Sequence, residues 1–103
     1  MKEIALIYTT FATHDDALAA LHTLIDEELA ACGNISAPHT AVYPWKGELK
    51  EDEEVAVFIK APFDKKDKLV KRLKKIHPYE LPCILEIDAA AIPEYAKWLK
   101  QAF

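Results

Sequence analysis

Residues 42–48 have the sequence VYPWKGE and decide the fold, because they join two long runs with strand character. The runs cover residues 34–45 and 48–61, and the second is clearest at 55–59, where every residue is apolar. A type I turn with Gly47 in the left-handed position is predicted to close the hairpin. Pro44 indicates an edge strand or a bulge, because proline donates no hydrogen bond to a neighbouring strand.

The predicted hairpin is long for a domain of this size. Each strand has about 12–14 residues, twice the usual length, and could span ~40 Å at ~3.3 Å per residue. Its tip is apolar, and a two-stranded arm is unstable by itself in water. We therefore expect the arm to lie against other copies of the chain in a closed ring. The alternative is a bent strand pair wrapped on its own core.

The segment before the hairpin predicts a strand and a helix. The apolar run 4–8 indicates a short strand buried on both faces. Thr13 and Asp16 form a capping-box pattern. Apolar residues then recur at helical spacing until Gly33, which is predicted to stop the helix.

The segment after the hairpin repeats this order. Pro62 ends the second hairpin strand, Asp64 is predicted to cap a helix, and Pro78 stops that helix. Residues 83–87 predict another strand, and Pro93 suits the first turn of a short C-terminal helix.

The order of these elements predicts a single α+β domain over residues 1–103. It is a ferredoxin-like βαββαβ arrangement with an extended central hairpin and a short C-terminal helix. Apolar residues (51 %) and charged residues (29 %) alternate along the chain, which excludes a disordered protein.

Charge, glycine and cysteine content exclude several functions. The net charge of −4 argues against a nucleic-acid partner, and the basic helix at 65–75 suits a solvated face better than an anion-binding one. Two glycines cannot form a phosphate-binding loop. Cys32 and Cys83 form no zinc knuckle and are expected to be buried and reduced. The first apolar run is too short for a signal peptide or membrane span, so we expect a cytoplasmic protein without a membrane partner.

No catalytic constellation is recognisable, and we predict that the chain is not an enzyme. Neither cysteine has an evident neighbouring base, and no Ser-His-Asp order can be argued. Acylphosphatases have this fold order but hold phosphate with an arginine beside the first strand, whereas the only arginine here is Arg72, in the second helix.

The chain resembles the CutA family, the divalent-cation-tolerance proteins, over essentially its whole length. Several separate motifs in the same order carry this resemblance: Tyr8-Thr9-Thr10, Leu29-Ala30-Ala31-Cys32-Gly33-Asn34-Ile35, Val42-Tyr43-Pro44-Trp45-Lys46-Gly47-Glu48, Glu53-Glu54-Val55, His77-Pro78-Tyr79-Glu80-Leu81-Pro82 and Tyr95-Ala96-Lys97-Trp98-Leu99. The resemblance implies a homotrimer with PII-like architecture and extended hairpins packed between subunits. The family is associated with tolerance to copper and other divalent ions, and animal relatives with acetylcholinesterase processing.

The resemblance also implies a ligand cleft between subunits, lined by Trp45, Lys60, Tyr79, Glu80 and Trp98. The residues alone single out His77 beside this set, since an imidazole, a phenol and a carboxylate occur within four positions held by two prolines. The structural alternative is that Tyr79 fills the core, Glu80 pairs with a lysine such as Lys60, and a partly cationic His77 completes the helix C-terminus.

Copper ligation in bacterial family members uses a cysteine on the first strand and two adjacent histidines. Tyr8 and Ile76 occupy two of those positions here, and only His77 remains as a metal ligand. A copper or zinc site requires three or four donor atoms. We therefore expect no obligatory cofactor and at most weak binding of Cu(II) or another divalent cation.

Three functions follow as alternatives. The first is tolerance or homeostasis of divalent metal ions, copper among them, through weak or regulatory cation binding by a trimer. The second is a PII-like small-ligand sensor that uses the cleft between subunits. The third is a structural trimer that acts through protein partners.

Overall fold

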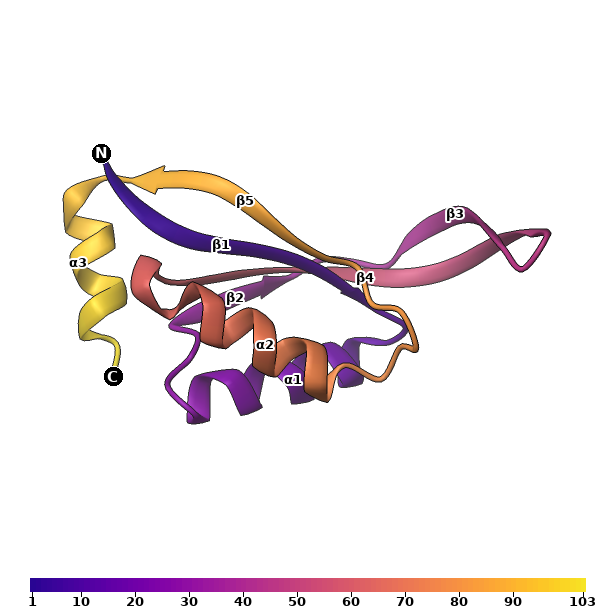
Figure 1. Cartoon of the computed structure of the whole chain (residues 1–103), viewed down its shortest axis with the longest axis horizontal. Coiled ribbons are helices and arrows are strands. Elements are labelled where there is room, and N and C mark those ends of the chain that lie inside the picture. Colours follow the sequence, from indigo (N-terminus) through magenta and orange to yellow (C-terminus); the bar gives the residue numbers. More distant parts are fainter.

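A computed structural model describes all 103 residues and confirms the predicted α+β order of elements (Figure 1). The elements are β1 (Lys2–Phe11), α1 (His14–Asp26), β2 (Cys32–Ile35), β3 (His39–Trp45), β4 (Glu48–Pro62), a 3-10 turn (Phe63–Lys65), α2 (Lys66–Ile76), β5 (Ile84–Ala91) and α3 (Pro93–Gln101). None of the three helices has the length and apolar character needed to cross a bilayer.

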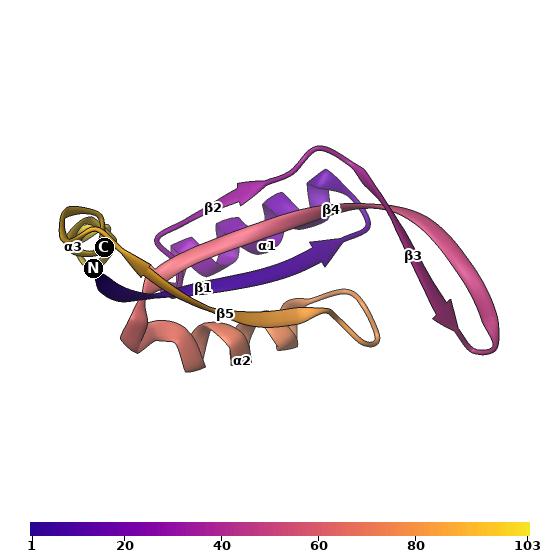
Figure 2. The ribbon, with the colours of Figure 1, turned by 90° about the horizontal axis from the view of Figure 1, so that it is seen from above.

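The strands form one antiparallel sheet in the order β2-β4-β1-β5, and β3 pairs only with β4. Helices α1 and α2 lie side by side on one face of this sheet (Figures 1 and 2). The core lies between the sheet and these helices, because alternate strand residues point toward them. Its largest buried side chains include Ile7, Phe11, Leu24, Ile59 and Leu73.

The opposite face of the sheet is mostly uncovered. Tyr8 pairs with Phe58 on one side and with Leu85 on the other, so these three side chains form one row across β4, β1 and β5. The rings of Tyr8 and Phe58 meet edge to face at 5.3 Å. Phe58 and Leu85 remain 40 % and 51 % exposed. Only one end of this face is covered, where α3 packs against Ile4.

The hairpin of β3 and β4 extends beyond the rest of the molecule as an arm (Figure 1). The chain measures 45 × 25 × 23 Å, and its radius of gyration of 14.3 Å exceeds the ~13 Å of a compact domain of about 100 residues. Figure 2 shows the arm curving away from the line of the sheet. The predicted overhang is therefore confirmed, and so is the edge position of Pro44.

The turn at the arm's tip corrects the predicted type I geometry. Trp45 pairs directly with Glu48, so the loop has two residues, Lys46 and Gly47. Their φ angles are 50° and 82°, and positive φ at both positions defines a type I′ turn. This turn matches the right-handed twist of long strands, which a type I turn would splay apart.

The prediction that Gly33 stops the first helix is wrong. Thr13 caps α1 as predicted, accepting a hydrogen bond from the Asp16 amide, but the helix ends at Asp26. Glu28 takes the left-handed conformation there, with φ of 59°. Gly33 lies in β2, where an added Cβ would come within 2.6 Å of a Leu21 methyl carbon. Its smallness lets β2 approach α1 closely.

Two further boundaries differ from expectation. The first hairpin strand is divided into β2 and β3 by the segment 36–38, which ends in Pro38. Asp64 lies inside the 3-10 turn and is not an N-cap, because the turn already begins at Phe63, directly after the extended Pro62. The end of α2 before Pro78 and the start of α3 at Pro93 are as predicted.

Candidate functional site

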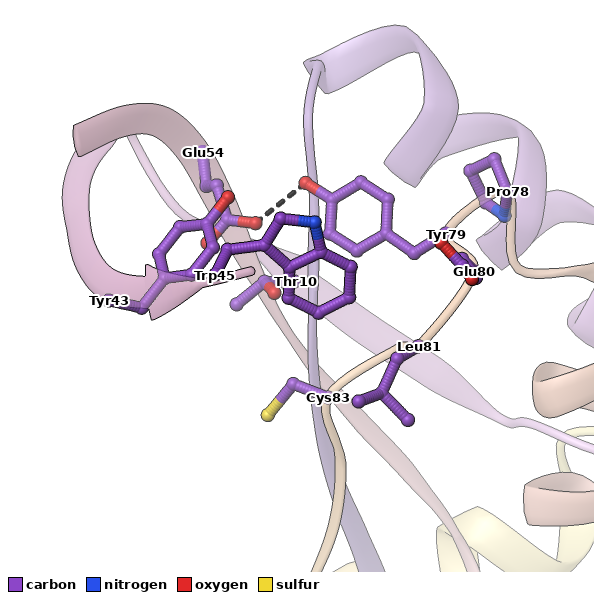
Figure 3. Close-up of a pocket in the computed structure, with 9 residues that line it drawn as sticks. All are labelled: Thr10, Tyr43, Trp45, Glu54, Pro78, Tyr79, Glu80, Leu81 and Cys83. Atoms are coloured by element: carbon purple, nitrogen blue, oxygen red, sulfur yellow. Dashed lines mark hydrogen bonds between the residues drawn. The ribbon is translucent and has the colours of Figure 1, made fainter. Parts of the chain in front are cut away.

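A pocket of about 460 Å³ lies where the arm meets the loop between α2 and β5 (Figure 3). The arm supplies two aromatic side chains and a carboxylate, and the loop supplies a phenol, a carboxylate, a thiol and apolar groups. The lining residues are Thr10, Tyr43, Trp45, Glu54, Pro78, Tyr79, Glu80, Leu81 and Cys83.

Two phenol–carboxylate hydrogen bonds organise the arm side of this pocket. Tyr79 donates its hydroxyl to Glu54 Oε2 at 2.6 Å, which ties the loop to β4 (Figure 3). Tyr43 donates in the same way to Asp52, across the two strands of the arm. Burial and the Glu54 carboxylate raise the pKa of Tyr79, and the bond to Asp52 raises that of Tyr43. Both phenols therefore stay protonated donors.

His77 lies buried behind the pocket and connects α2, β1 and the loop. Its Nδ1 accepts a hydrogen bond from the Tyr79 amide at 3.1 Å, so its Nε2 carries the proton and donates to the Thr10 carbonyl at 2.8 Å. The ring stacks on Phe11, with centroids 4.3 Å apart. Burial lowers the pKa of His77, so the partly cationic ring considered from the sequence is wrong, and the imidazole is neutral.

A second cluster lies at the opposite end of the molecule, around Tyr95 of α3. Lys60 Nζ lies 5.7 Å from the centroid of the Tyr95 ring, and Trp98 stacks beside it with centroids 5.7 Å apart. The Tyr95 hydroxyl is 3.3 Å from Cys32 Sγ. Two residues of the predicted ligand cleft, Lys60 and Trp98, belong to this cluster and not to the pocket.

Comparison with known proteins places the chain in a family. Residues 5–102 match the family model described as CutA1 divalent ion tolerance protein. The chain belongs to the CutA1 family. It is 40 % identical over 95 residues to the divalent-cation tolerance protein CutA of Pyrococcus horikoshii. The aligned residues cover 91 % of this chain and 92 % of that relative.

Solved structures agree with this assignment. The crystal structure of CutA1 from Ehrlichia chaffeensis has a TM-score of 0.93 and 34 % identity, covering 99 % of this chain and 96 % of that one. A structure from Archaeoglobus fulgidus, described as a periplasmic divalent cation tolerance protein CutA, has a TM-score of 0.89 and 27 % identity. The match covers 96 % of this chain and 97 % of that one. The CutA1 fold is therefore shown for this chain.

Within one CutA1-family subunit, the predicted cleft residues form two groups. Trp45, Tyr79 and Glu80 line the pocket with His77 directly behind it, whereas Lys60 and Trp98 lie at the far end. Their assembly between subunits stays a prediction. The ion pair of Glu80 with Lys60 is not formed, because these residues belong to the two different ends.

Donors for a metal ion are not assembled in a single subunit. No group of three His, Cys, Asp or Glu side chains is placed to hold one ion. Both ring nitrogens of His77 are engaged, so this residue could ligate a metal only if its ring left Thr10 or the Tyr79 amide. Tyr8 and Ile76 stand at the other two positions that the resemblance singled out, and neither is a metal donor here; Tyr8 packs on Phe58.

The sequence did not single out Glu54, Tyr43 or Cys83 as site residues. Glu54 is one of four consecutive acidic residues, which look alike in the sequence. Side chains alternate between the two faces of a strand, so Asp52 and Glu54 point to one face of β4 while Glu51 and Glu53 point to the other. That signal was available once Tyr43 was placed on the facing strand. Cys83 was expected to be buried, but it is exposed and lines the pocket, because the loop leaves α2 at Pro78 and crosses the open end of the sheet.

The neutral state of His77 predicts acid sensitivity. The unfolded chain binds a proton near the ordinary histidine pKa of about 6.5, whereas the folded ring binds it only at lower pH. Stability should therefore be complete above about pH 6.5 and should fall as the pH drops from there toward the lowered folded pKa. Urea unfolding between pH 5 and pH 8 measures this dependence. His77→Gln should flatten it, while His22→Gln, an exposed position on α1, should leave it unchanged.

Proposed function

We propose that this protein serves in tolerance to divalent metal ions, with copper among them, and that it binds such ions weakly or in a regulatory way. The observation that carries the proposal is the match to the divalent ion tolerance family over residues 5–102, together with relatives at up to 40 % identity that are named for this role. No known enzyme family is indicated, and we propose a binding function without catalysis.

The pocket supplies the donors that such weak binding would use. Glu54 and Glu80 offer carboxylate oxygens, and Cys83 offers a thiol. Burial and the charge of Glu54 raise the pKa of Cys83, which keeps it a thiol and makes it a poor ligand at neutral pH. Carboxylates of this kind suit a loosely held cation and not a closed copper site.

We further propose that the functional unit is a homotrimer resembling the PII proteins in architecture. The apolar row of Tyr8, Phe58 and Leu85 is uncovered on the open sheet face. On the arm, Val42 and Leu49 are 60 % and 72 % exposed. Apolar surface on a sheet face and on an unsupported hairpin supports packing against identical copies in a closed ring.

Location in the cytoplasm is proposed on the free thiols of Cys32 and Cys83. The Archaeoglobus relative is described as periplasmic, so cell fractionation with an antibody to this protein is the direct test.

Calorimetric titration with Cu(II) and Zn(II), with Mg(II) as a reference, tests the metal proposal. We expect saturable Cu(II) binding with a micromolar or weaker dissociation constant, corresponding to about −8 kcal/mol at most. Glu54→Gln should weaken it, whereas the outward-facing Glu53→Gln should not. His77→Ala reports whether the imidazole becomes a ligand.

Two results would contradict the proposal. Binding of small anionic metabolites without any metal binding would favour the PII-like sensor. No heat with any ion or metabolite, from a protein that is folded and trimeric, would favour the structural trimer.

A further inference from the structure

The pocket at the root of the arm combines aromatic walls with negative charge. Tyr43 and Trp45 line it from the arm and Tyr79 from the facing loop (Figure 3). Glu54 and Glu80 contribute carboxylates, and no lysine or arginine is among the nine lining residues. Aromatic rings around an anionic group attract cations, because the face of each ring carries a partial negative charge.

The carboxylates of this pocket have no cationic partner in the chain. The ion pairs of the protein are Lys50 with Glu48, Lys66 with Glu86, and Arg72 with Glu27, so neither Glu54 nor Glu80 is neutralised. Glu54 uses its Oε2 atom to accept the Tyr79 hydroxyl, which fixes the carboxylate in place. Its second oxygen forms no hydrogen bond or ion pair within the chain and is available to a ligand.

The indole of Trp45 already has a cation against it. Lys46, from the turn of the arm, places Nζ 5.8 Å from the centroid of the Trp45 ring without lining the pocket. This contact is within the ~6 Å range in which a cation and a ring attract each other. Figure 3 draws the same indole between the rings of Tyr43 and Tyr79.

We propose that this pocket binds an organic cation, an alkylammonium or guanidinium group, with Trp45 and Tyr79 against its apolar part and Glu54 against its charge. A weakly hydrated organic cation suits these aromatic walls. A tightly held metal ion needs three or more donors around it, and no group of three His, Cys, Asp or Glu side chains is placed to hold one. The charged group comes either from a free amine or from a lysine or arginine side chain of another protein molecule. The inference does not rest on the proposed role in metal tolerance.

Titration with n-butylammonium, against n-butanol as the uncharged analogue of the same length, tests the proposal. In the chain of residues 1–103, Trp98→Phe leaves Trp45 as the single tryptophan, so the tryptophan fluorescence reports on the pocket. At constant ionic strength we expect a saturable change with n-butylammonium and about tenfold weaker binding of n-butanol. Equal affinity for the two compounds, or no fluorescence change with the amine, overturns the proposal.

Two variants separate the pocket from the general acidity of the arm. Glu54→Gln should weaken n-butylammonium binding about tenfold, while the neighbouring Glu53→Gln, on the opposite face of β4, should leave it unchanged. Equal weakening by both would overturn the proposal in favour of nonspecific attraction. The comparison of amine with alcohol in the parent protein stands even if a variant fails to fold.

Sedimentation at the same amine concentrations distinguishes the two sources of the cation. An unchanged oligomeric state together with saturable binding supports a free amine as ligand. Dissociation of subunits on adding the amine supports a lysine or arginine of a neighbouring copy as the occupant, displaced by the probe. Titrations with Cu(II) are run separately, so failure of metal binding and failure of amine binding are independent results.

Discussion

Replacing Phe58 with glutamate is expected to convert the proposed trimer to a folded monomer at micromolar concentration. Phe58 lies on the uncovered sheet face, in one row with Tyr8 and Leu85, where the proposed trimer would bury it. A carboxylate in that position would lose its hydration without gaining a partner, which costs several kcal/mol in each subunit. Within one subunit the side chain already contacts solvent, so the fold itself should persist.

Analytical ultracentrifugation measures the mass, and circular dichroism verifies the fold. Leu18→Glu on α1 is the matched control, because Leu18 is 39 % exposed and Phe58 is 40 % exposed, and both residues are apolar. Leu18 lies on the helical side of the molecule, away from the open sheet face, so its replacement should leave a trimer. A trimer that persists in Phe58→Glu, or a wild-type monomer, would show that this face is not the subunit interface.

Local patterns in the sequence were sufficient for most of the fold. Thr13 caps α1 and Pro93 begins α3 because these signals act within a few residues of the backbone they affect. The spacing of apolar residues along the chain predicted the correct order of strands and helices, because that spacing also reflects the local backbone conformation. Gly47 also takes a left-handed conformation, as a turn residue should.

Long-range packing explains what the sequence could not reveal. Gly33 follows an apolar run of helical spacing, but its role depends on Leu21, twelve positions earlier, whose side chain occupies the space a Cβ would need. Glu28 ends the helix in the left-handed conformation without being a glycine. The Ala30 amide then reaches back to the Leu24 carbonyl, a backbone bond that is invisible in the residue types.

The candidate site was predicted only in part for the same reason. The segment at 77–82 was recognised by its chemistry, yet the partner of Tyr79 is Glu54, which lies 25 positions away. Residues near the ends of two long strands come together or stay apart according to register, so Trp45 and Lys60 lie in separate clusters of one subunit. Only a partner subunit could unite them.

The second large effect is expected from Phe11→Ala, which should destabilise the protein by about 3–5 kcal/mol. Phe11 is 1 % exposed and is among the largest fully buried side chains. It ends β1 opposite Val55 and stacks on His77, so it joins the core to the loop that lines the pocket. Most small domains are stable by only about 5–15 kcal/mol, so a loss of this size would be plain in urea unfolding.

The same substitution should alter the response to acid, which a loss of core volume alone would not do. Burial is the main cause of the lowered pKa of His77, and the missing ring would admit water to the imidazole. Its pKa should then rise toward the ordinary value, and the fall of stability below about pH 6.5 should become shallower. Phe11→Leu, which removes less buried volume and is expected to cost less, replaces the alanine variant in this measurement if that variant does not fold. Phe63→Ala is the control, because that ring is 42 % exposed and its loss should cost under ~1 kcal/mol. The prediction is contradicted if Phe11→Ala lowers the free energy of unfolding no more than the control does and leaves the acid response unchanged. The stacking of Phe11 on His77 would then contribute neither to stability nor to the lowered pKa of His77.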